Sequence, residues 1–183
     1  MTDCMISAPQ PEAVEAGLDI FKAGGNVMDA AIAAAFVQTV VDPQMCGIAG
    51  FGSMQIYMPG KDIHSFIDFH GKAPKATKSD MWEHLIEREC DDSFGFALKG
   101  QVNEFGYQSM TSPMTLQAFN TALQRHGTMS LGQVLQSAID YCINGFAVRP
   151  RVLGFWLQPA QAGRIERVAV VNKLDAARKI YLS

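Results

Sequence analysis

Residues 24–52 read GGNVMDAAIAAAFVQTVVDPQMCGIAGFG, and this stretch decides the fold. Asn26 is a good N-cap, and Asp29 stands three residues later, where a carboxylate meets the positive end of a helix. From Ala30 to Val41 nearly every side chain is small or apolar, and a helix without a polar face must be surrounded by protein or lipid. Roughly 15 residues are too few to cross a bilayer, which takes about 20. The stretch therefore predicts a core helix.

The predicted core helix ends at Asp42-Pro43, because the residue before a proline is pushed out of the helical region. Three glycines at positions 47, 50 and 52 then allow a tight turn or a close approach of the backbone. A strand from Ser53 to Met58, a turn at 59–62 and a strand from Ile63 to Phe69 have the composition of a β-hairpin. Phe66 and Phe69 do not share a face under strict alternation, so we expect both faces of this sheet to be covered.

This run resembles the start of the gamma-glutamyltransferase (gamma-glutamyltranspeptidase) family, whose hallmark is a GGNA-x-DAA helix, a proline turn and a glycine-rich approach to a strand. The positions that match are Gly24, Gly25, Asn26, Asp29, Ala30, Ala31, Pro43, Gly47, Gly50 and Gly52. Two positions depart from the pattern, since Met28 follows Val27 before the aspartate and Ala49 stands where a glycine is usual. The resemblance implies an α/β (α+β) fold. The chain would be the helix-rich N-terminal portion of an N-terminal nucleophile hydrolase, which is a four-layer α/β/β/α sandwich.

Outside this stretch, periodicity and capping signals predict further helices over 11–23, 79–89, 112–126, from Ser130 to a stop at Gly145, and over 151–162. We expect Cys90 to Met110 to be a long connection with strand character around 94–98. The inward side chains expected in the first, third and fourth of these helices are Val14, Gly17, Leu18, Phe21, Leu116, Phe119, Leu123, Leu131, Val134, Leu135, Ala138, Ile139 and Cys142. The side chains expected to face outward in the first helix are Glu12, Glu15, Asp19 and Lys22.

The length of 183 residues fits one domain or a piece of a larger one. No repeat or linker is visible, so we expect residues 1–183 to be a single unit, and the resemblance makes it the N-terminal fragment of a large subunit. A net charge of −3 and a pI near 5.8 argue against a nucleic-acid partner. No apolar run has membrane-spanning length, and the first residues lack the basic and apolar regions of a signal peptide. The sequence therefore favours a cytoplasmic protein or one whose leader is missing.

The cysteines predict neither a disulfide framework nor a zinc site, because the four are scattered without a CxxC pair. Cys46 and Cys142 lie in apolar settings, and we expect both to be small core side chains. Nothing else in the sequence indicates a cofactor or a metal ion.

Residues 68–74 read DFHGKAP, and here the resemblance bears on function. In typical members the stretch is Asp-x-Arg-Glu-x-Ala-Pro, and the arginine holds the α-carboxylate of the glutamyl donor. His70 stands at the arginine position and Gly71 at the glutamate position. Arginine makes two parallel, permanently charged hydrogen bonds, whereas a histidine, with an ordinary pKa of ~6.5, is mostly neutral at pH 7. Two interpretations stay open: His70 binds the substrate, or it is only a polar residue at the end of a strand.

The resemblance also implies the mechanism. A precursor cuts itself before a threonine, whose hydroxyl becomes the nucleophile and whose freed amine serves as the base. Backbone N–H groups at a glycine pair would stabilise the oxyanion. The family's Thr-Thr-His block does not occur in this chain, so we expect no catalytic residue in it. The implied partners are a small-subunit segment that carries the threonine and a small-molecule γ-glutamyl or other acyl substrate.

Other sources of a nucleophile have weak support in the sequence. Ser53 is not in a Gly-x-Ser-x-Gly elbow, because residue 55 is glutamine. Cys46 has no neighbouring histidine in sequence, and GIAGFG lacks the Gly-Lys-Ser/Thr ending of a P-loop. Two alternatives to a γ-glutamyl enzyme follow. One is an acylase-type amidohydrolase on the same scaffold, and the other is a truncated, non-catalytic remnant.

Overall fold

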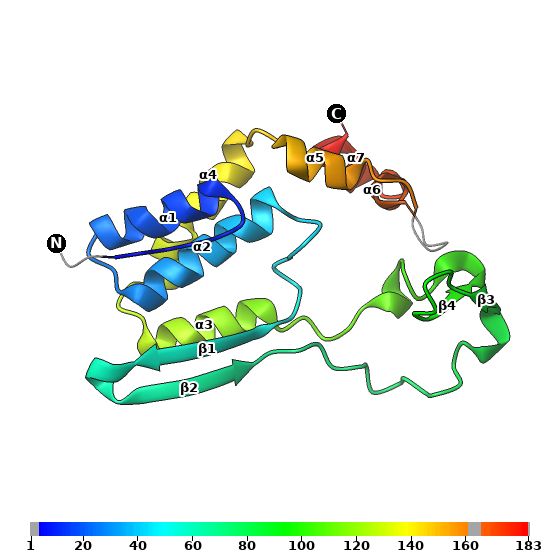
Figure 1. Cartoon of the computed structure of the whole chain (residues 1–183), viewed down its shortest axis with the longest axis horizontal. Helices are drawn as coiled ribbons and strands as arrows, with labels where there is room; N and C mark the ends of the chain where they lie inside the picture. Colours follow the sequence, from blue (N-terminus) through cyan, green and yellow to red (C-terminus); the bar gives the residue numbers. More distant parts are fainter. Residues whose placement is uncertain (1–3, 161–165, 183) are drawn as a thin grey trace. The chain divides into compact units, whose positions relative to one another are not determined.

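The computed structural model describes residues 4–160 and 166–182, and the chain forms two compact units (Figure 1). Unit 1 comprises residues 1–71 and 113–148, and unit 2 comprises residues 72–112 and 149–183. The expectation of a single unit over residues 1–183 stays a prediction. In the described residues, no helix has both the length and the apolar character that crossing a membrane requires.

Unit 1 is built around helix α2 (Val27–Val41), which contacts α1 (Pro11–Lys22), α3 (Thr115–His126) and α4 (Leu131–Asn144). The predicted core helix is confirmed, because its apolar side chains are buried on several sides. Those at most 1% exposed are Ala30, Ile32, Ala33, Phe36 and Val37. The predicted start is confirmed too: the Asn26 side chain accepts from the N–H groups of Met28 and Asp29, and the Asp29 carboxylate accepts from the Asn26 N–H.

The buried face of α1 differs from the expected one. Gly17 is buried as expected, but Val14, Leu18 and Phe21 are only half-buried. Ala13, Ala16 and Ile20 on the neighbouring face are buried in their place. Glu12, expected to face outward, is buried. The reason is a close approach to α2, since a Cβ on Gly17 would lie 3.1 Å from the carbonyl oxygen of Ala30. The distance between packed helices depends on the side chains at the contact, and here small residues form it.

Strands β1 (Ser53–Met58) and β2 (Ile63–Asp68) form the predicted antiparallel hairpin, with Ser53 opposite Asp68 and Met58 opposite Ile63. Within unit 1 the described residues cover one face of this hairpin. Ile56 on the inner face is 4% exposed, whereas Tyr57 and Phe66 on the outer face are 68% and 62% exposed. Strict alternation separates the two sets, and the covering of the outer face stays a prediction.

Helix α3 begins at Thr115, three residues after the expected Ser112. Its start has no side-chain cap. Instead, the carbonyl of Gly50 accepts from the N–H groups of Met114 and Thr115, at 3.1 and 3.3 Å. The glycine turn after α2 therefore supplies the cap. Gly50 and Thr115 are 65 positions apart, so the residues next to α3 in sequence do not predict this contact. The predicted end before Gly127 is confirmed.

Helix α4 begins with the predicted Ser130–Gln133 capping box and ends at Gly145. Its buried stripe is narrower than expected, because Val134 and Ala138 are buried while Ile139 and Cys142 are exposed. Leu116 on α3, also expected inward, is 44% exposed. The principal contact of α4 in the described structure is α2, and one neighbouring helix covers only a narrow stripe.

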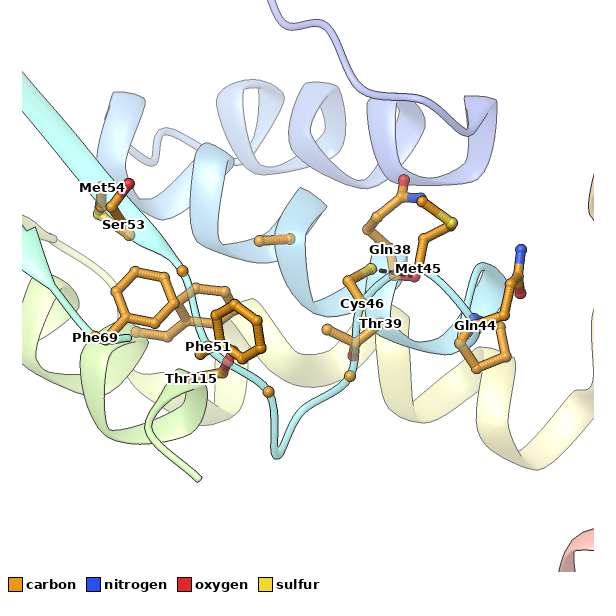
Figure 2. A pocket seen from close by; sticks show the side chains of 16 residues that line it. Gln38, Thr39, Gln44, Met45, Cys46, Phe51, Ser53, Met54, Phe69 and Thr115 are labelled. Carbon is orange, nitrogen blue, oxygen red and sulfur yellow. Dashed lines mark hydrogen bonds between the residues drawn. The ribbon is translucent and has the colours of Figure 1, made fainter. Parts of the chain in front are cut away.

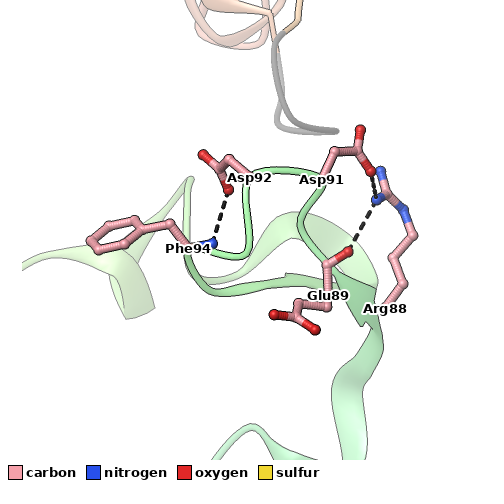
Figure 3. A network of polar contacts seen from close by, with 5 residues as sticks. All are labelled: Arg88, Glu89, Asp91, Asp92 and Phe94. Carbon is pink, nitrogen blue, oxygen red and sulfur yellow. Dashed lines mark hydrogen bonds and ion pairs between the residues drawn. The ribbon is translucent and has the colours of Figure 1, made fainter.

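Unit 2 contains the clearest error of the sequence-based prediction. The helix expected over 79–89 is wrong: a 3-10 turn, η2 (Glu83–Leu85), leads into strand β3 (Ile86–Glu89), which pairs antiparallel with β4 (Phe96–Leu98). The connection is a tight turn, in which the Asp92 carboxylate accepts from the N–H of Phe94 and Arg88 pairs with Asp91 (Figure 3). A hydrogen bond of this kind and the positive φ of Gly95 (+95°) stabilise the turn of a hairpin. Cross-strand pairing then outweighs the weak helix preference of residues 79–89.

The rest of unit 2 is short segments. They are the 3-10 turns η3 (Lys99–Gln101) and η4 (Tyr107–Ser109) and the helices α5 (Pro150–Trp156), α6 (Arg167–Asn172) and α7 (Asp175–Tyr181). The helix expected over 151–162 is confirmed in its first part but ends at Trp156, shortly before Pro159. Residues 161 and 162 lie outside the described residues.

Candidate functional site

The predicted site residue His70 lies just past the end of β2. The pairing of the hairpin continues by one pair beyond the strand, because the N–H of Phe69 donates to the carbonyl of Gly52 at 3.0 Å. Phe69 points into the core, where its ring centroid lies 6.0 Å from that of Phe119. Side chains alternate along an extended chain, so Asp68 and His70 lie on the opposite, exposed face.

His70 is held by Asp68. The backbone N–H of His70 donates to Asp68 Oδ1 at 3.0 Å, and His70 Nδ1 lies 2.9 Å from the same oxygen. Both side chains stay accessible, with 62% of His70 and 67% of Asp68 exposed. The ring of Phe51 lies against His70, with centroids 5.7 Å apart and planes tilted by 37°. The pair is therefore ordered by its neighbours and still reachable from solvent.

Asp68 and Phe51 are site residues that the sequence analysis did not identify. The alternation of an extended segment offers a signal for Asp68, because residues i and i+2 share a face. Phe51 offers no comparable signal, since it lies in the irregular stretch between the glycines, 19 positions from His70 in sequence.

A pocket of about 600 Å³ lies in unit 1 beside this strand end (Figure 2). Its walls come from the last turns of α2, the segment 43–54, Phe69 and the start of α3. Phe51 lines it and also contacts His70. Most of the lining is apolar, and the polar side chains include Gln38, Thr39 and Thr115. The concave shape and the mostly apolar lining suit a small apolar part of a ligand more than a charged group.

Cys46 lines the same pocket but is not activated. Its thiol donates to the carbonyl oxygens of Gln38 and Asp42, at 3.4 and 3.7 Å. Burial and, after it, the negative charge of Asp42 raise the pKa of the Cys46 thiol to about 11. The thiolate is the nucleophilic form, so this cysteine has no nucleophile at neutral pH. Ser53 begins a strand instead of standing at a strand-to-helix turn, which agrees with its exclusion as an elbow serine.

The remaining groups that could act on a substrate are dispersed. In residues 4–160 and 166–182, no three side chains of His, Cys, Asp or Glu come together as metal ligands would.

Comparison with known proteins extends these observations. The family model described as gamma-glutamyltranspeptidase matches residues 13–183. The Acylase ACY 1 proenzyme of Pseudomonas sp. (strain V22) is 36% identical over 149 residues, which are 80% of this chain and 25% of that protein. The glutathione hydrolase proenzyme of Bacillus subtilis (strain 168) is 32% identical over 146 residues, which are 80% of this chain and 24% of that protein. The chain thus spans about a quarter of the length of these curated relatives.

Solved structures share the fold. The gamma-glutamyltranspeptidase of Helicobacter pylori superimposes with a TM-score of 0.77 and 24% identity, covering 98% of this chain and 47% of that chain. The enzyme from Pseudomonas nitroreducens, complexed with L-DON, gives a TM-score of 0.72 and 28% identity over 85% of this chain and 43% of that chain. The predicted fold class, the α+β N-terminal portion of an N-terminal nucleophile hydrolase, is confirmed. The role of His70 stays a prediction.

Proposed function

The chain belongs to the gamma-glutamyltranspeptidase family, and from that premise we propose that it is the N-terminal part of the large subunit of an acyl-transferring or acyl-hydrolysing enzyme. The observation that carries the proposal is the extent of the match, which runs over residues 13–183 yet spans about a quarter of the glutathione hydrolase and acylase proenzymes. The proposed donors are γ-glutamyl compounds such as glutathione.

The proposed chemistry uses a threonine outside this chain. Its hydroxyl attacks the acyl carbon of the donor amide, its own α-amine takes the proton, and the amine of the donor leaves with a proton. Water or an acceptor amine then attacks the acyl-enzyme ester and releases the threonine. In this scheme the chain supplies scaffold and one edge of the substrate site, where His70 contacts the donor.

The outer face of the β1–β2 hairpin supports the need for a partner segment. Tyr57 and Phe66 expose large apolar surfaces there, and no described element of unit 1 covers them. An exposed apolar face of this kind favours packing against another segment of protein. We propose that the small-subunit segment that carries the threonine belongs to this partner layer.

A second candidate is an acylase-type amidohydrolase on the same scaffold with a different acyl donor. The specific observation in its favour is the pair of Asp68 and His70 at the place where the family's arginine is expected. An exposed imidazole lacks the two parallel donors that grip a carboxylate.

The proposal is tested on the coding sequence that follows Ser183 and on the protein it encodes. We expect a Thr-Thr-His block, self-cleavage before its first threonine, and release of aniline from a γ-glutamyl or a glutaryl anilide. Residues 1–183 expressed alone should be inactive, and insoluble or strongly bound by a hydrophobic dye. A reading frame that stops at Ser183, with a cooperative, monomeric melt of the chain alone, would instead support a non-catalytic remnant.

The contact between His70 and the donor has its own test in the full-length enzyme. We expect His70→Arg to raise kcat/KM for a γ-glutamyl anilide, because the substitution restores the two-pronged donor for the α-carboxylate. His84→Arg is the control, since His84 is an exposed histidine of η2, outside the β1–β2 hairpin whose outer face we propose that the small subunit covers. Equal effects of the two substitutions would show that added positive charge, and not position 70, is responsible.

A further inference from the structure

Resting on the proposed function, we infer that Asp68 is a positioning residue that fixes the tautomer of His70. As a consequence, His70 favours an acyl donor that presents an N–H or O–H group at this place, as in the second candidate function, over the α-carboxylate of a γ-glutamyl donor. An arginine at this position would present hydrogen-bond donors to the substrate, whereas His70 would present an acceptor. Three observations carry it.

The first observation fixes the proton on the ring. An ionised carboxylate can only accept hydrogen bonds. Asp68 Oδ1 lies 2.9 Å from His70 Nδ1 and 3.0 Å from the backbone nitrogen of the same residue, so both nitrogens must donate to it. In a neutral imidazole the proton on Nδ1 leaves Nε2 as a lone-pair acceptor. No described residue donates a hydrogen bond to Nε2, so a ligand can use it.

The second observation concerns charge. With a neutral ring, Nε2 presents a lone pair, whereas an arginine at the same position would present N–H donors. A substrate carboxylate at Nε2 would meet a lone pair and a nearby carboxylate, and it would gain no hydrogen bond. An amide N–H, an ammonium or a hydroxyl would gain one. Because both side chains are more than half exposed, solvent screens this preference to a modest size.

The third observation is the neighbouring aromatic ring. Phe51 lies 5.7 Å from the His70 ring, is 65% exposed and lines the pocket of about 600 Å³. The face of an aromatic ring is negative, so it attracts N–H groups and cations and disfavours carboxylates. Where a ligand group meets that face, the Phe51 ring favours the same class of group as Nε2, and the pocket lined by Phe51 offers room for an apolar part of that ligand.

The test compares two anilides that differ only at the group in question, a γ-glutamyl anilide with its α-carboxylate and the same compound with an α-carboxamide. Assays of the full-length enzyme run at about pH 8.5. We expect the enzyme to prefer the carboxamide about fivefold in kcat/KM, the worth of one exposed hydrogen bond. Asp68→Asn should bring this ratio toward one, and His70→Arg should invert it. His84→Ala, at an exposed histidine of η2, is the control and should leave the ratio unchanged.

A spectroscopic measurement separates the positioning step from the chemistry. The ¹⁵N shifts of the His70 ring, assigned by loss of the signals in His70→Ala, should show a protonated Nδ1 and an unprotonated Nε2 at the same pH. Asp68→Asn should shift the proton toward Nε2, a change that loss of structural support alone would not produce. A wild-type ring protonated mainly on Nε2 would overturn the inference whatever the kinetics show.

The outcomes also separate this inference from the proposed function. An enzyme active on anilides whose carboxamide ratio is the same in wild type and His70→Ala would overturn the inference and leave the proposed function intact. Inactivity toward every anilide, including the glutaryl compound, would overturn the proposed function and the donor preference together. In that case the ring signals still decide whether Asp68 sets the tautomer.

Discussion

Two aspartates of unit 1 illustrate opposite uses of the same group. Asp29 is fully buried, and its carboxylate accepts from the N–H groups of Asn26, Thr128 and Met129 and from the hydroxyl of Thr128. Asp68 is two-thirds exposed, and a single oxygen accepts from two nitrogens of His70. A buried carboxylate with its hydrogen-bonding capacity filled can only hold the fold together. An exposed one that orients a ring leaves the far side of that ring for a ligand.

The Asp29 contacts join segments far apart in sequence. They tie the start of α2 to the loop between α3 and α4, which lies about a hundred positions along the chain, and Asn26 adds a bond from its side-chain amide to the carbonyl of His126. Burial alone would raise the pKa of Asp29. The Thr128 hydroxyl and the backbone N–H groups of Asn26, Met129 and Thr128 outweigh that effect, so the pKa lies below its usual value.

The largest expected effect is therefore at Asp29. Asp29→Asn should lower the free energy of unfolding by about 3 kcal/mol or more, because it removes the charge and turns an NH₂ group toward backbone donors that lose their acceptor. Urea unfolding of the full-length enzyme measures it. Asp19→Asn is the control, an exposed aspartate on α1 paired with Lys22, and its loss should cost less than about 1 kcal/mol. Equal losses of unfolding free energy in the two variants would mean that the buried hydrogen bonds of Asp29 stabilise the fold no more than the exposed ion pair of Asp19.

A smaller effect is expected at Gly127, which lies against the same carboxylate. A Cβ there would be 2.7 Å from Asp29 Oδ1 and 2.8 Å from the carbonyl oxygen of Leu123. Gly127→Ala should therefore destabilise by about 2 kcal/mol through overpacking. Gly132→Ala is the matched substitution, because a Cβ meets nothing within 4 Å there and alanine favours a helix by about 0.5–1 kcal/mol. Gly127→Ala should thus lower the free energy of unfolding and Gly132→Ala should raise it. A stabilising Gly127→Ala would contradict the close contact of Gly127 with Asp29.

Acid should weaken the Asp29 contacts. A carboxyl whose pKa is lowered by folding contributes stability at pH values above its unfolded pKa of about 3.9, and this contribution is lost as the pH falls through the folded pKa. The difference in stability between the wild type and Asp29→Asn should therefore shrink as the pH is lowered below about 4. Unfolding curves at a series of pH values measure it, and a difference that stays constant down to pH 2 would contradict the lowered pKa.

The same contrast explains which parts of the structure the sequence predicts. Elements defined by neighbours in sequence were predicted well, as at the capping box of Asn26 and Asp29, the β1–β2 hairpin and the start of α4 at Ser130. Features set by distant partners were missed. The cap of α3 comes from Gly50, and the helix expected over 79–89 gave way to a strand because β4 pairs with it.

The candidate site divides in the same way. The position of His70 could be taken from its resemblance to a family motif, and the end of the strand before it was predicted to within one residue from the composition of the hairpin. The contact with Phe51 depends on the path of an irregular segment, and the state of the Cys46 thiol depends on burial and on Asp42, so neither could be derived from neighbouring residues.

The smallest expected effect on stability is at the Asp68 and His70 pair. Both side chains are more than half exposed, so removing one leaves no buried group without a partner, and the exchange of an exposed pair is worth at most about 1 kcal/mol. We expect Asp68→Asn and His70→Arg to leave the urea midpoint nearly unchanged while they alter the donor preference. A loss as large as that of Asp29→Asn would place the pair in the framework of the fold. The distinction between the two aspartates would then fail, because a group that the fold cannot spare is a poor choice for setting specificity.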